Sequence, residues 1–285
     1  ALQNFSRFRV NVFRQRGTHA IVMRVIPVKI PTFEELMLPN TLREIVNLKN
    51  GIVLVTGPTG SGKSSTLAAV IDVINQTHSF HIVTIEDPIE FMHPHKSSTI
   101  HQRELHADCP TFSRALRSAL RQAPKVILVG EMRDVETIEI ALEASETGHL
   151  VLSTLHTTDA AKTVDRIVGV FPKNEEQIIR TRLANAFRFI VSQRLIPKAD
   201  SLGRVAAIEI LRSNSRTREY IERGSSGEEG RSLVDAMKDG GNEGMQTFDQ
   251  VIEQLIRKRV IGFDTGLQYA TNAGNLRIEL ADFVP

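Results

Sequence analysis

The sequence predicts an α/β protein with a mainly parallel β-sheet, and two observations support this class. Between residues 51 and 212, apolar segments of strand length alternate with segments of helical periodicity, which is the pattern of parallel strands joined by helical crossovers. The first segment, Ile52–Thr56, runs into a glycine-rich turn that is followed at once by a helical stretch, Ser65–Asn75. This order of strand, glycine turn and helix is typical of a phosphate-binding loop.

Two strand candidates precede the alternating series. Apolar and polar residues alternate in Phe8–Val12, as in a half-buried strand, and His19–Ile26 is the second candidate. Because two strands alone are only marginally stable, we expect them to complete a sheet that begins before this sequence. Pro27–Pro31 predicts an extended linker, and Thr32 with Glu35 forms a capping-box pattern that opens a short helix.

The remaining elements follow in order along the chain. The strands expected after the first span His81–Glu86, Lys125–Gly130, Leu150–Leu155, Ile190–Arg194 and Arg204–Leu211. The helices between them span Thr111–Gln122, Val135–Glu146, Thr158–Val168 and Glu175–Phe187. A helical tail is expected over Arg216–Arg223, Gly230–Met237, Thr247–Arg259 and Asp264–Tyr269. The pattern divides the chain into the end of an N-terminal domain with its linker (1–30), a core (31–212) and a helical C-terminal part (213–285).

The glycine-rich turn has the chemistry of a triphosphate-binding loop. Its glycines allow positive φ and bring backbone N–H groups close to a phosphate chain, and the following helix N-terminus adds partial positive charge there. Lys63 is placed to reach the β- and γ-phosphates, and the Ser64 hydroxyl to ligate Mg²⁺. With ATP and Mg²⁺ as ligands, the expected binding residues are Gly57, Pro58, Thr59, Gly60, Ser61, Gly62, Lys63, Ser64 and Ser65.

Acidic residues follow two of the expected strands. Ligands of open parallel sheets sit at the carboxyl ends of the strands, where this chain carries Glu86, Asp87 and Glu90 after one strand and Glu131 after the next. An acid after an apolar strand can hold the metal, and the long side chain of Glu131 suits contact with Mg²⁺ through water. Glu90 projects beyond its strand and is the candidate base that orients the attacking water, with Glu86 or Asp87 as alternatives.

His149 and His156 bracket the expected strand Leu150–Leu155. His156 follows the carboxyl end of the strand, where it can sense the γ-phosphate and pass its presence to the next helix. His149 fits a hydrogen-bonded structural residue as well as a functional one. A histidine metal site is not favoured, because the chain has no HExxH pattern or other close ligand spacing.

The opening segment is rich in arginine and contains no acidic residue. Its arginines are Arg7, Arg9, Arg14, Arg16 and Arg24. On an alternating strand Arg7 and Arg9 share one face, where they can guard a strand edge against pairing. The alternative is that Arg7 or Arg9 acts as an arginine finger on the transferring γ-phosphoryl, an effect worth about 10³–10⁵ in rate. A finger from a separate domain would act across a subunit boundary.

Composition excludes several other classes of protein. Lys and Arg number 35 against 33 Asp and Glu, so the net charge of +2 gives no argument for nucleic acid or an anionic membrane. The single cysteine, Cys109, excludes an internal disulfide framework and a four-cysteine zinc site. The apolar runs are too short to span a bilayer, and no signal-peptide pattern opens the sequence. We therefore expect a soluble cytoplasmic protein.

Four segments resemble the Walker A, aspartate-box, Walker B and histidine-box motifs of bacterial type II secretion and type IV pilus ATPases. In order they are GPTGSGKSS at 57–65, TIEDPIEF at 84–91, GEMRD at 130–134 and TGHLVLSTLHTTDAAKTVDRI at 147–167. GMQTFDQ at 244–250 and the single cysteine are similar to the PilT-like retraction branch, since the assembly and type II secretion ATPases usually carry a four-cysteine zinc element. The resemblance covers nearly the whole chain.

The resemblance implies a RecA-like P-loop core behind a PAS-like α+β N-terminal domain, here mostly absent. It implies a hexameric ring that hydrolyses ATP between subunits and drives pilus retraction through an inner-membrane platform protein, from the cytoplasmic side. By motif, Glu131 is the Walker B acid, Glu90 the catalytic glutamate, and His149 with His156 the histidine box. The N-terminal arginines match those that family members insert into the site of a neighbouring subunit.

Other interpretations stay open at this level. Arg216–Ile221 replaces an AIRxxI-type stretch of the retraction ATPases, and the end at Asn275–Leu280 resembles a PilU-like paralogue, so a principal motor and an accessory one that works beside a paralogous ATPase are both consistent. A nucleic-acid motor would need basic loops with stacking aromatics, but the chain has no Trp and two Tyr, so we expect no nucleic acid. A small-molecule kinase would need an acceptor pocket and an arginine-rich lid, and neither is identified.

Overall fold

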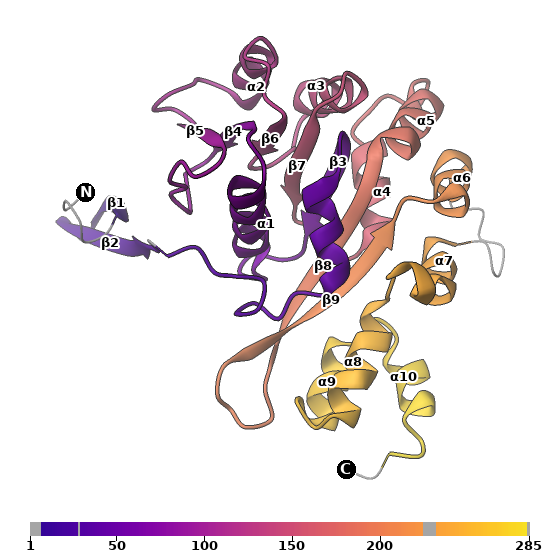
Figure 1. Ribbon diagram of the computed structural model, residues 1–285. Coiled ribbons are helices and arrows are strands. Elements are labelled where there is room, and N and C mark those ends of the chain that lie inside the picture. Colours follow the sequence, from indigo (N-terminus) through magenta and orange to yellow (C-terminus); the bar gives the residue numbers. More distant parts are fainter. Residues whose placement is uncertain (1–6, 28, 225–231, 284–285) are drawn as a thin grey trace.

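The computed structural model describes residues 7–27, 29–224 and 232–283. Its centre is a seven-stranded sheet in the order β5-β4-β6-β7-β3-β8-β9, and a two-stranded sheet, β1-β2, lies apart from it at the end of an extended segment (Figure 1). The strands are β1 (Arg7–Gln15), β2 (Thr18–Ile26), β3 (Gly51–Thr56), β4 (His81–Glu86), β5 (Thr99–Glu104), β6 (Val126–Val129), β7 (Leu150–Leu155), β8 (Phe187–Pro197) and β9 (Arg204–Arg212).

The helices cover both faces of the sheet and continue beyond it. They are η1 (Asn40–Asn47), α1 (Lys63–Thr77), α2 (Phe112–Leu120), α3 (Val135–Glu146), α4 (Ala160–Val168), α5 (Glu176–Ala186), α6 (Ser215–Arg223), α7 (Leu233–Asp239), η2 (Gly240–Glu243), α8 (Phe248–Arg257), α9 (Phe263–Tyr269) and α10 (Ala273–Glu279). All strand pairs of the large sheet are parallel except β8 with β9. The prediction of an α/β core with a parallel-dominated sheet is confirmed.

The central strand β3 shows how the sequence builds two apolar layers. All six of its residues are buried, and they alternate between the two faces of the sheet. Ile52 and Leu54 belong to the core formed with α2–α5, whereas Val53 and Val55 belong to the core formed with α1 and η1. A parallel strand covered on both faces therefore reads as a continuous apolar run, which is why β3 and β7 were recognisable from the sequence.

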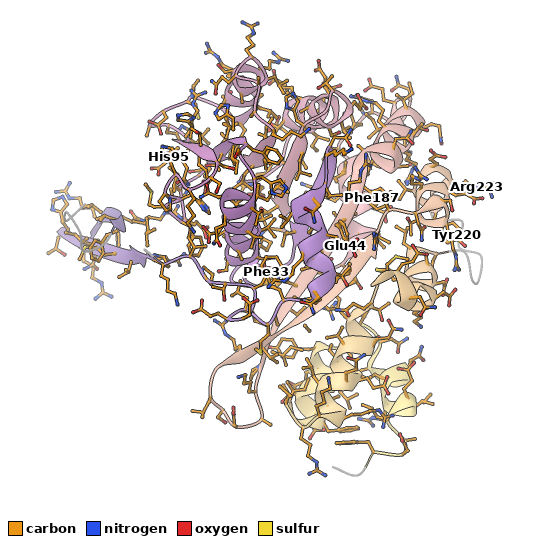
Figure 2. All side chains as sticks on the ribbon, viewed as in Figure 1. Phe33, Glu44, His95, Phe187, Tyr220 and Arg223 are labelled. Carbon is orange, nitrogen blue, oxygen red and sulfur yellow. The ribbon has the colours of Figure 1, made fainter. Side chains whose placement is uncertain are left out.

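Most predicted elements are present, and the differences have physical causes. β5 was missed because it is a polar strand at the edge of the sheet, with Ile100 as its buried apolar residue. Phe187 was expected to end a helix but begins β8, where it is fully buried and pairs with Ile52 (Figure 2). Thr32 and Glu35 form the reciprocal bonds of a capping box, at 3.0 and 3.1 Å, but the segment makes a turn and not a helix.

The C-terminal helices pack on the far part of the β8–β9 hairpin, beyond the edge of the parallel strands (Figure 1). Ile196 and Val205 of this hairpin share an apolar cluster with Phe248, Ile252 and Leu276. The predicted helix start at Gly230 lies outside the described residues, and α10 was not predicted. Within the described ranges, no helix is both long and apolar enough to cross a bilayer.

Candidate active site

The phosphate loop between β3 and α1 adopts a conformation that requires glycine. Gly57, Gly60 and Gly62 have φ of +141°, +79° and +95°. A Cβ added at Gly57 would lie 2.5 Å from the carbonyl oxygen of Gln193 and 2.6 Å from Ser61 Oγ. The Ser61 hydroxyl is buried and has no hydrogen-bond partner within the described chain. The loop is therefore a tight cradle with a spare polar group at the N-terminus of α1, as a phosphate site needs.

Lys63, His156 and Glu131 lie together beside this cradle. Lys63 Nζ donates to the carbonyl oxygens of Gly57 at 2.8 Å and Pro58 at 3.1 Å, and it lies 3.4 Å from His156 Nδ1. On its other side, His156 Nε2 lies 3.6 Å from Glu131 Oε2. The His156 imidazole thus lies between the Lys63 ammonium and the Glu131 carboxylate and links the two groups.

Burial and nearby acids act on Lys63 in opposite directions. Desolvation lowers the pKa of the Lys63 ammonium, while Glu131 and Glu90 raise it. Glu131 also forms an ion pair with Arg133 at 2.5 Å. Arg133 was not among the predicted site residues. The close spacing of Arg133 to Glu131 in the GEMRD segment was the available signal, but it does not show which way either side chain points.

The two acids after β4 occupy different positions. Glu86 is buried; its carboxylate accepts from Thr84 at 2.6 Å and Gln102 at 3.1 Å, and also from the backbone N–H of Glu90 at 3.3 Å. Burial raises the pKa of Glu86, and these hydrogen bonds act against that rise. Both residues line the cavity described next, but the side chain of Glu90 is exposed, whereas the carboxylate of Glu86 accepts from the Glu90 backbone. Asp87 is also exposed in the same turn.

The carboxyl ends of β3, β4, β6 and β7 open onto one cavity of about 790 Å³. Its lining includes Lys63, Ser64, Glu90, Glu131, His156 and also His93. His93 is almost fully buried, and its Nδ1 has no hydrogen-bond partner within the described chain. Desolvation lowers the pKa of His93 to about 4, so its imidazole is neutral at pH 7. His93 lies outside the motifs recognised in the sequence and was not among the predicted site residues.

The structure does not bring His149 to this cavity. His149 precedes β7 at the amino end of the strand, and its Nδ1 is 2.6 Å from the carbonyl oxygen of Pro124. Six strand residues separate it from His156. Within one chain His149 therefore lies at the amino ends of the parallel strands, away from the cavity, and its catalytic role stays a prediction.

The arginines of the β1–β2 hairpin differ in whether they line the cavity. Arg9 is exposed on β1 and is paired across the sheet with Arg24 of β2, so the two side chains share one face. Arg24 lines the cavity of its own chain. The Arg7 backbone begins β1, but its side chain lies outside the described part of the chain.

A glycine cradle, a lysine and a helix N-terminus at one end of a parallel sheet, facing acids from two neighbouring strands, define the class of P-loop nucleotide-binding proteins. A comparison with protein families agrees: residues 3–261 match the family described as type II/IV secretion system protein. The chain belongs to this family.

Individual relatives narrow the comparison. A twitching motility protein of Neisseria gonorrhoeae is 48% identical over 275 residues, which cover 96% of this chain and 72% of the relative. The type IV pilus retraction ATPase PilT of Pseudomonas aeruginosa is 48% identical, over 93% of this chain and 76% of the relative. The type IV pilus ATPase PilU of the same organism is 40% identical, over 97% and 71%.

A solved structure has the same fold. The crystal structure of the pilus retraction motor PilT with bound ADP superposes with a TM-score of 0.87 at 45% identity. The match covers 95% of this chain and 76% of that one. The resemblance first inferred from four short motifs is thus confirmed over almost the whole sequence.

Proposed function

We propose that this chain is an ATP-hydrolysing motor that powers type IV pilus retraction. The observation that carries the proposal is the meeting of Lys63, His156 and Glu131 beside the glycine cradle, in a chain 48% identical to a retraction ATPase over 93% of its length. A relative's crystal structure with bound ADP supports a nucleotide at this cradle. The cavity gives the reaction one location, at the carboxyl ends of β3, β4, β6 and β7.

Each side chain of the site has a distinct task in hydrolysis. The backbone N–H groups of the loop and the Lys63 ammonium bind the phosphates. Glu90 orients the attacking water, because its carboxylate is free in the cavity whereas that of Glu86 is committed to three hydrogen bonds. His156 contacts both Lys63 and Glu131, so it responds to whether the γ-phosphate is present.

Ser64 and Glu131 are the residues that would hold Mg²⁺, the latter through water. No group of three or more His, Cys, Asp or Glu side chains in the described ranges forms a metal site by itself. This fits Mg²⁺, which is bound by one or two protein groups together with substrate phosphates and water. The ion supplies neutralisation of phosphate charge when it is bound.

The motor works as a homohexamer in which the arginine-bearing hairpin of one subunit faces the site of the next. The hairpin that bears Arg7 and Arg9 projects from the core, which supports a role for one of them across a subunit boundary (Figure 1). The ring acts at the cytoplasmic side of the inner membrane on the pilus platform protein. The higher identity to PilT than to PilU favours the principal motor over an accessory one.

Lys63→Ala tests the enzymatic part of the proposal. Loss of the ammonium should lower ATP turnover, measured as phosphate release, by about 100-fold or more. Lys125→Ala is the matched control. Lys125 Nζ donates to the carbonyl oxygen of Gly148 at 3.2 Å, at the amino ends of the parallel strands and away from the cavity. Turnover by Lys63→Ala at the wild-type rate would refute the proposal.

A deletion strain tests the cellular part. Loss of twitching with an excess of surface pili would identify a retraction motor, and rescue should require the wild-type chain and fail with Lys63→Ala. Bald cells would instead identify an extension motor. Twitching that persists after deletion would favour the accessory role.

A further inference from the structure

Glu209 of β9 is a buried carboxylate that the proposed chemistry does not use. It is 4% exposed and pairs across the sheet with Ser192, which in turn pairs with Thr56, the last residue before the phosphate loop. Its Oε1 accepts from the backbone N–H of Ala160, the first residue of α4, at 2.8 Å. Phe248, the first residue of α8, lies beside this carboxylate, and its backbone lowers the pKa of Glu209.

Glu209 thus joins the start of a core helix to the start of a C-terminal helix. Both helices are at least nine residues long, and the positive ends of both dipoles face the same carboxylate. Desolvation raises the pKa of Glu209 to about 7, while these hydrogen bonds and Arg194 lower it and Asp159 raises it further. On balance, burial therefore disfavours the charged form of Glu209, and the helix starts and Arg194 offset only part of this effect.

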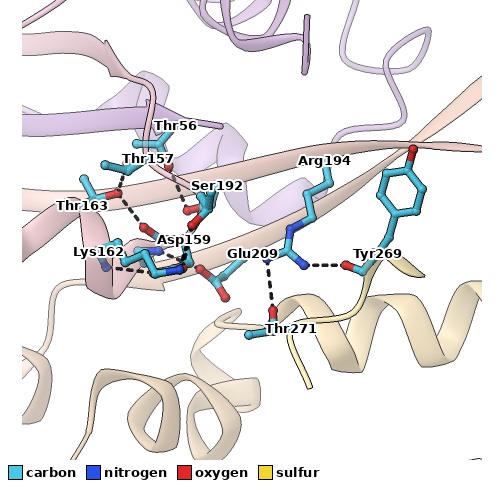
Figure 3. A network of polar contacts seen from close by, with 12 residues as sticks. Thr56, Thr157, Asp159, Lys162, Thr163, Ser192, Arg194, Glu209, Tyr269 and Thr271 are labelled. Atoms are coloured by element: carbon cyan, nitrogen blue, oxygen red, sulfur yellow. Dashed lines mark hydrogen bonds and ion pairs between the residues drawn. The ribbon is translucent and has the colours of Figure 1, made fainter. Parts of the chain in front are cut away.

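Arg194 extends the connection to the end of α9. Its guanidinium donates to the carbonyl oxygen of Tyr269 at 2.5 Å and to Thr271 Oγ1 at 3.1 Å (Figure 3), and it lies over the ring of Phe248, 3.7 Å from the centroid. Asp249 of α8 accepts from the backbone N–H groups of Thr271 and Asn272, at 2.6 and 2.9 Å. Arg194 of β8 and Asp159 before α4 are the charged groups that act on Glu209, and Asp249 of α8 acts on Arg194.

On the core side, the hydrogen-bond partner of Glu209, Ala160, is close in sequence to His156. Only four residues, His156–Asp159, separate the end of β7 from Ala160. Asp159 caps α4 by accepting from the backbone N–H of Lys162 at 2.8 Å, and Oγ1 of Thr157, in the loop before α4, lies 2.6 Å from Oγ1 of Thr163 in this helix (Figure 3). A movement of His156 would therefore be passed to the first turn of α4, and from there to the carboxylate of Glu209.

On the basis of the proposed function, we propose that Glu209 is a positioning residue that couples the nucleotide state at His156 to the docking of helices α8 and α9. The same carboxylate accepts from the first residue of α4 and lies beside the first residue of α8. A shift of α4 changes the geometry available to α8, so nucleotide binding and the position of the C-terminal helices become linked. The C-terminal helices would then move with each ATP cycle.

Hydrogen exchange with and without a non-hydrolysable ATP analogue tests this coupling in the whole chain. In the wild type, the analogue should change the exchange of amides in both α1 and α8. In Glu209→Gln, the α1 response should remain and the α8 response should disappear. The KM for ATP should stay within about twofold, while kcat should fall by about tenfold. Glu209→Asp, which keeps the charge, should restore part of the α8 response.

Thr111→Ala is the matched control. Thr111 caps α2 through Oγ1, which accepts from the backbone N–H of Arg114 at 3.2 Å, and α2 packs on the same face of the sheet as α4. This variant loses a helix cap without touching the C-terminal helices, so its α8 response to the analogue should equal that of the wild type. An equal loss in Thr111→Ala would show general destabilisation and overturn the coupling role.

The remaining outcomes separate this proposal from the function on which it rests. Two outcomes overturn the coupling and leave the ATPase proposal standing. The first is an α8 response in Glu209→Gln that equals that of the wild-type protein. The second is that the wild-type protein shows a response in α1 but none in α8. No response in wild-type α1 refutes nucleotide binding itself, and the coupling falls with it. If Glu209→Gln does not fold, Arg194→Met cuts the same connection on its outer side, and a retained α8 response there also overturns the proposal.

Discussion

The two ends of β7 carry the same residue type in different roles. At the amino end, His149 contacts the carbonyl oxygen of Pro124, and nearby Lys125 donates to that of Gly148, so these side chains satisfy backbone groups. At the carboxyl end, His156 faces the side chains of Lys63 and Glu131 in an open cavity. At the amino ends of the parallel strands these polar residues hydrogen-bond to the backbone, whereas at the carboxyl ends they meet at the candidate site.

The largest expected difference between the two ends of the parallel strands comes from substituting a glycine at each end. Gly57→Ala should abolish nucleotide binding, because its Cβ would meet the Gln193 carbonyl oxygen at 2.5 Å with φ at +141°. Gly148→Ala, at the amino end, meets nothing within 4 Å but has φ of +107°, so it should cost about 1–2 kcal/mol of stability and keep turnover. Calorimetry and binding of a fluorescent nucleotide measure both. Wild-type binding by Gly57→Ala would contradict the comparison.

The histidines provide the next contrast. His156→Gln should lower kcat by about 100-fold, because the imidazole that lies between Lys63 and Glu131 is lost, with little effect on stability. His149→Gln should leave kcat within about twofold and lower stability by about 1 kcal/mol through its lost hydrogen bond to Pro124. Steady-state kinetics and thermal melts decide between the two effects. Equal losses of kcat in both variants would show that the amino end is also part of the catalytic machinery.

The last prediction concerns the pH dependence of stability, and it has the smallest expected effect on turnover at a fixed pH. The folded pKa of Glu209 is about 7, above its ordinary value of 4.5, so the folded state binds the extra proton between these pH values. This group therefore favours folding at low pH, and its contribution is lost as pH rises from about 4.5 to about 7, by up to about 3 kcal/mol.

Denaturant melts between pH 4.5 and 8 measure this contribution. Glu209→Gln should remove that part of the fall in stability, so the difference between variant and wild type should change with pH in this window. Glu139→Gln, at an exposed position of α3, corrects for the removal of one charge. A variant-to-wild-type difference that is independent of pH would contradict the raised pKa.

Local patterns predicted the core because its strands are buried on both faces and its loops carry special residues. β4, β7 and α3 have the predicted bounds, and the Asp134 side chain caps α3 by accepting from the backbone N–H of Thr137 at 2.9 Å. β5 and α10 were missed because each buries little apolar surface of its own. Both elements are stabilised by contacts with neighbouring elements, and such contacts leave no periodic apolar pattern in the sequence.

What the sequence alone determined was the class: a glycine cradle after an apolar strand, with acids and a histidine at the ends of later strands. Those features are local, because loop conformation and strand burial follow from adjacent residues. Tertiary structure decided which polar groups meet. It separated His149 from His156, committed Glu86 to hydrogen bonds while leaving Glu90 free, and set Glu209 between two helix starts. Such contacts depend on the register and stacking of segments far apart in the chain, so no single stretch of sequence encodes them.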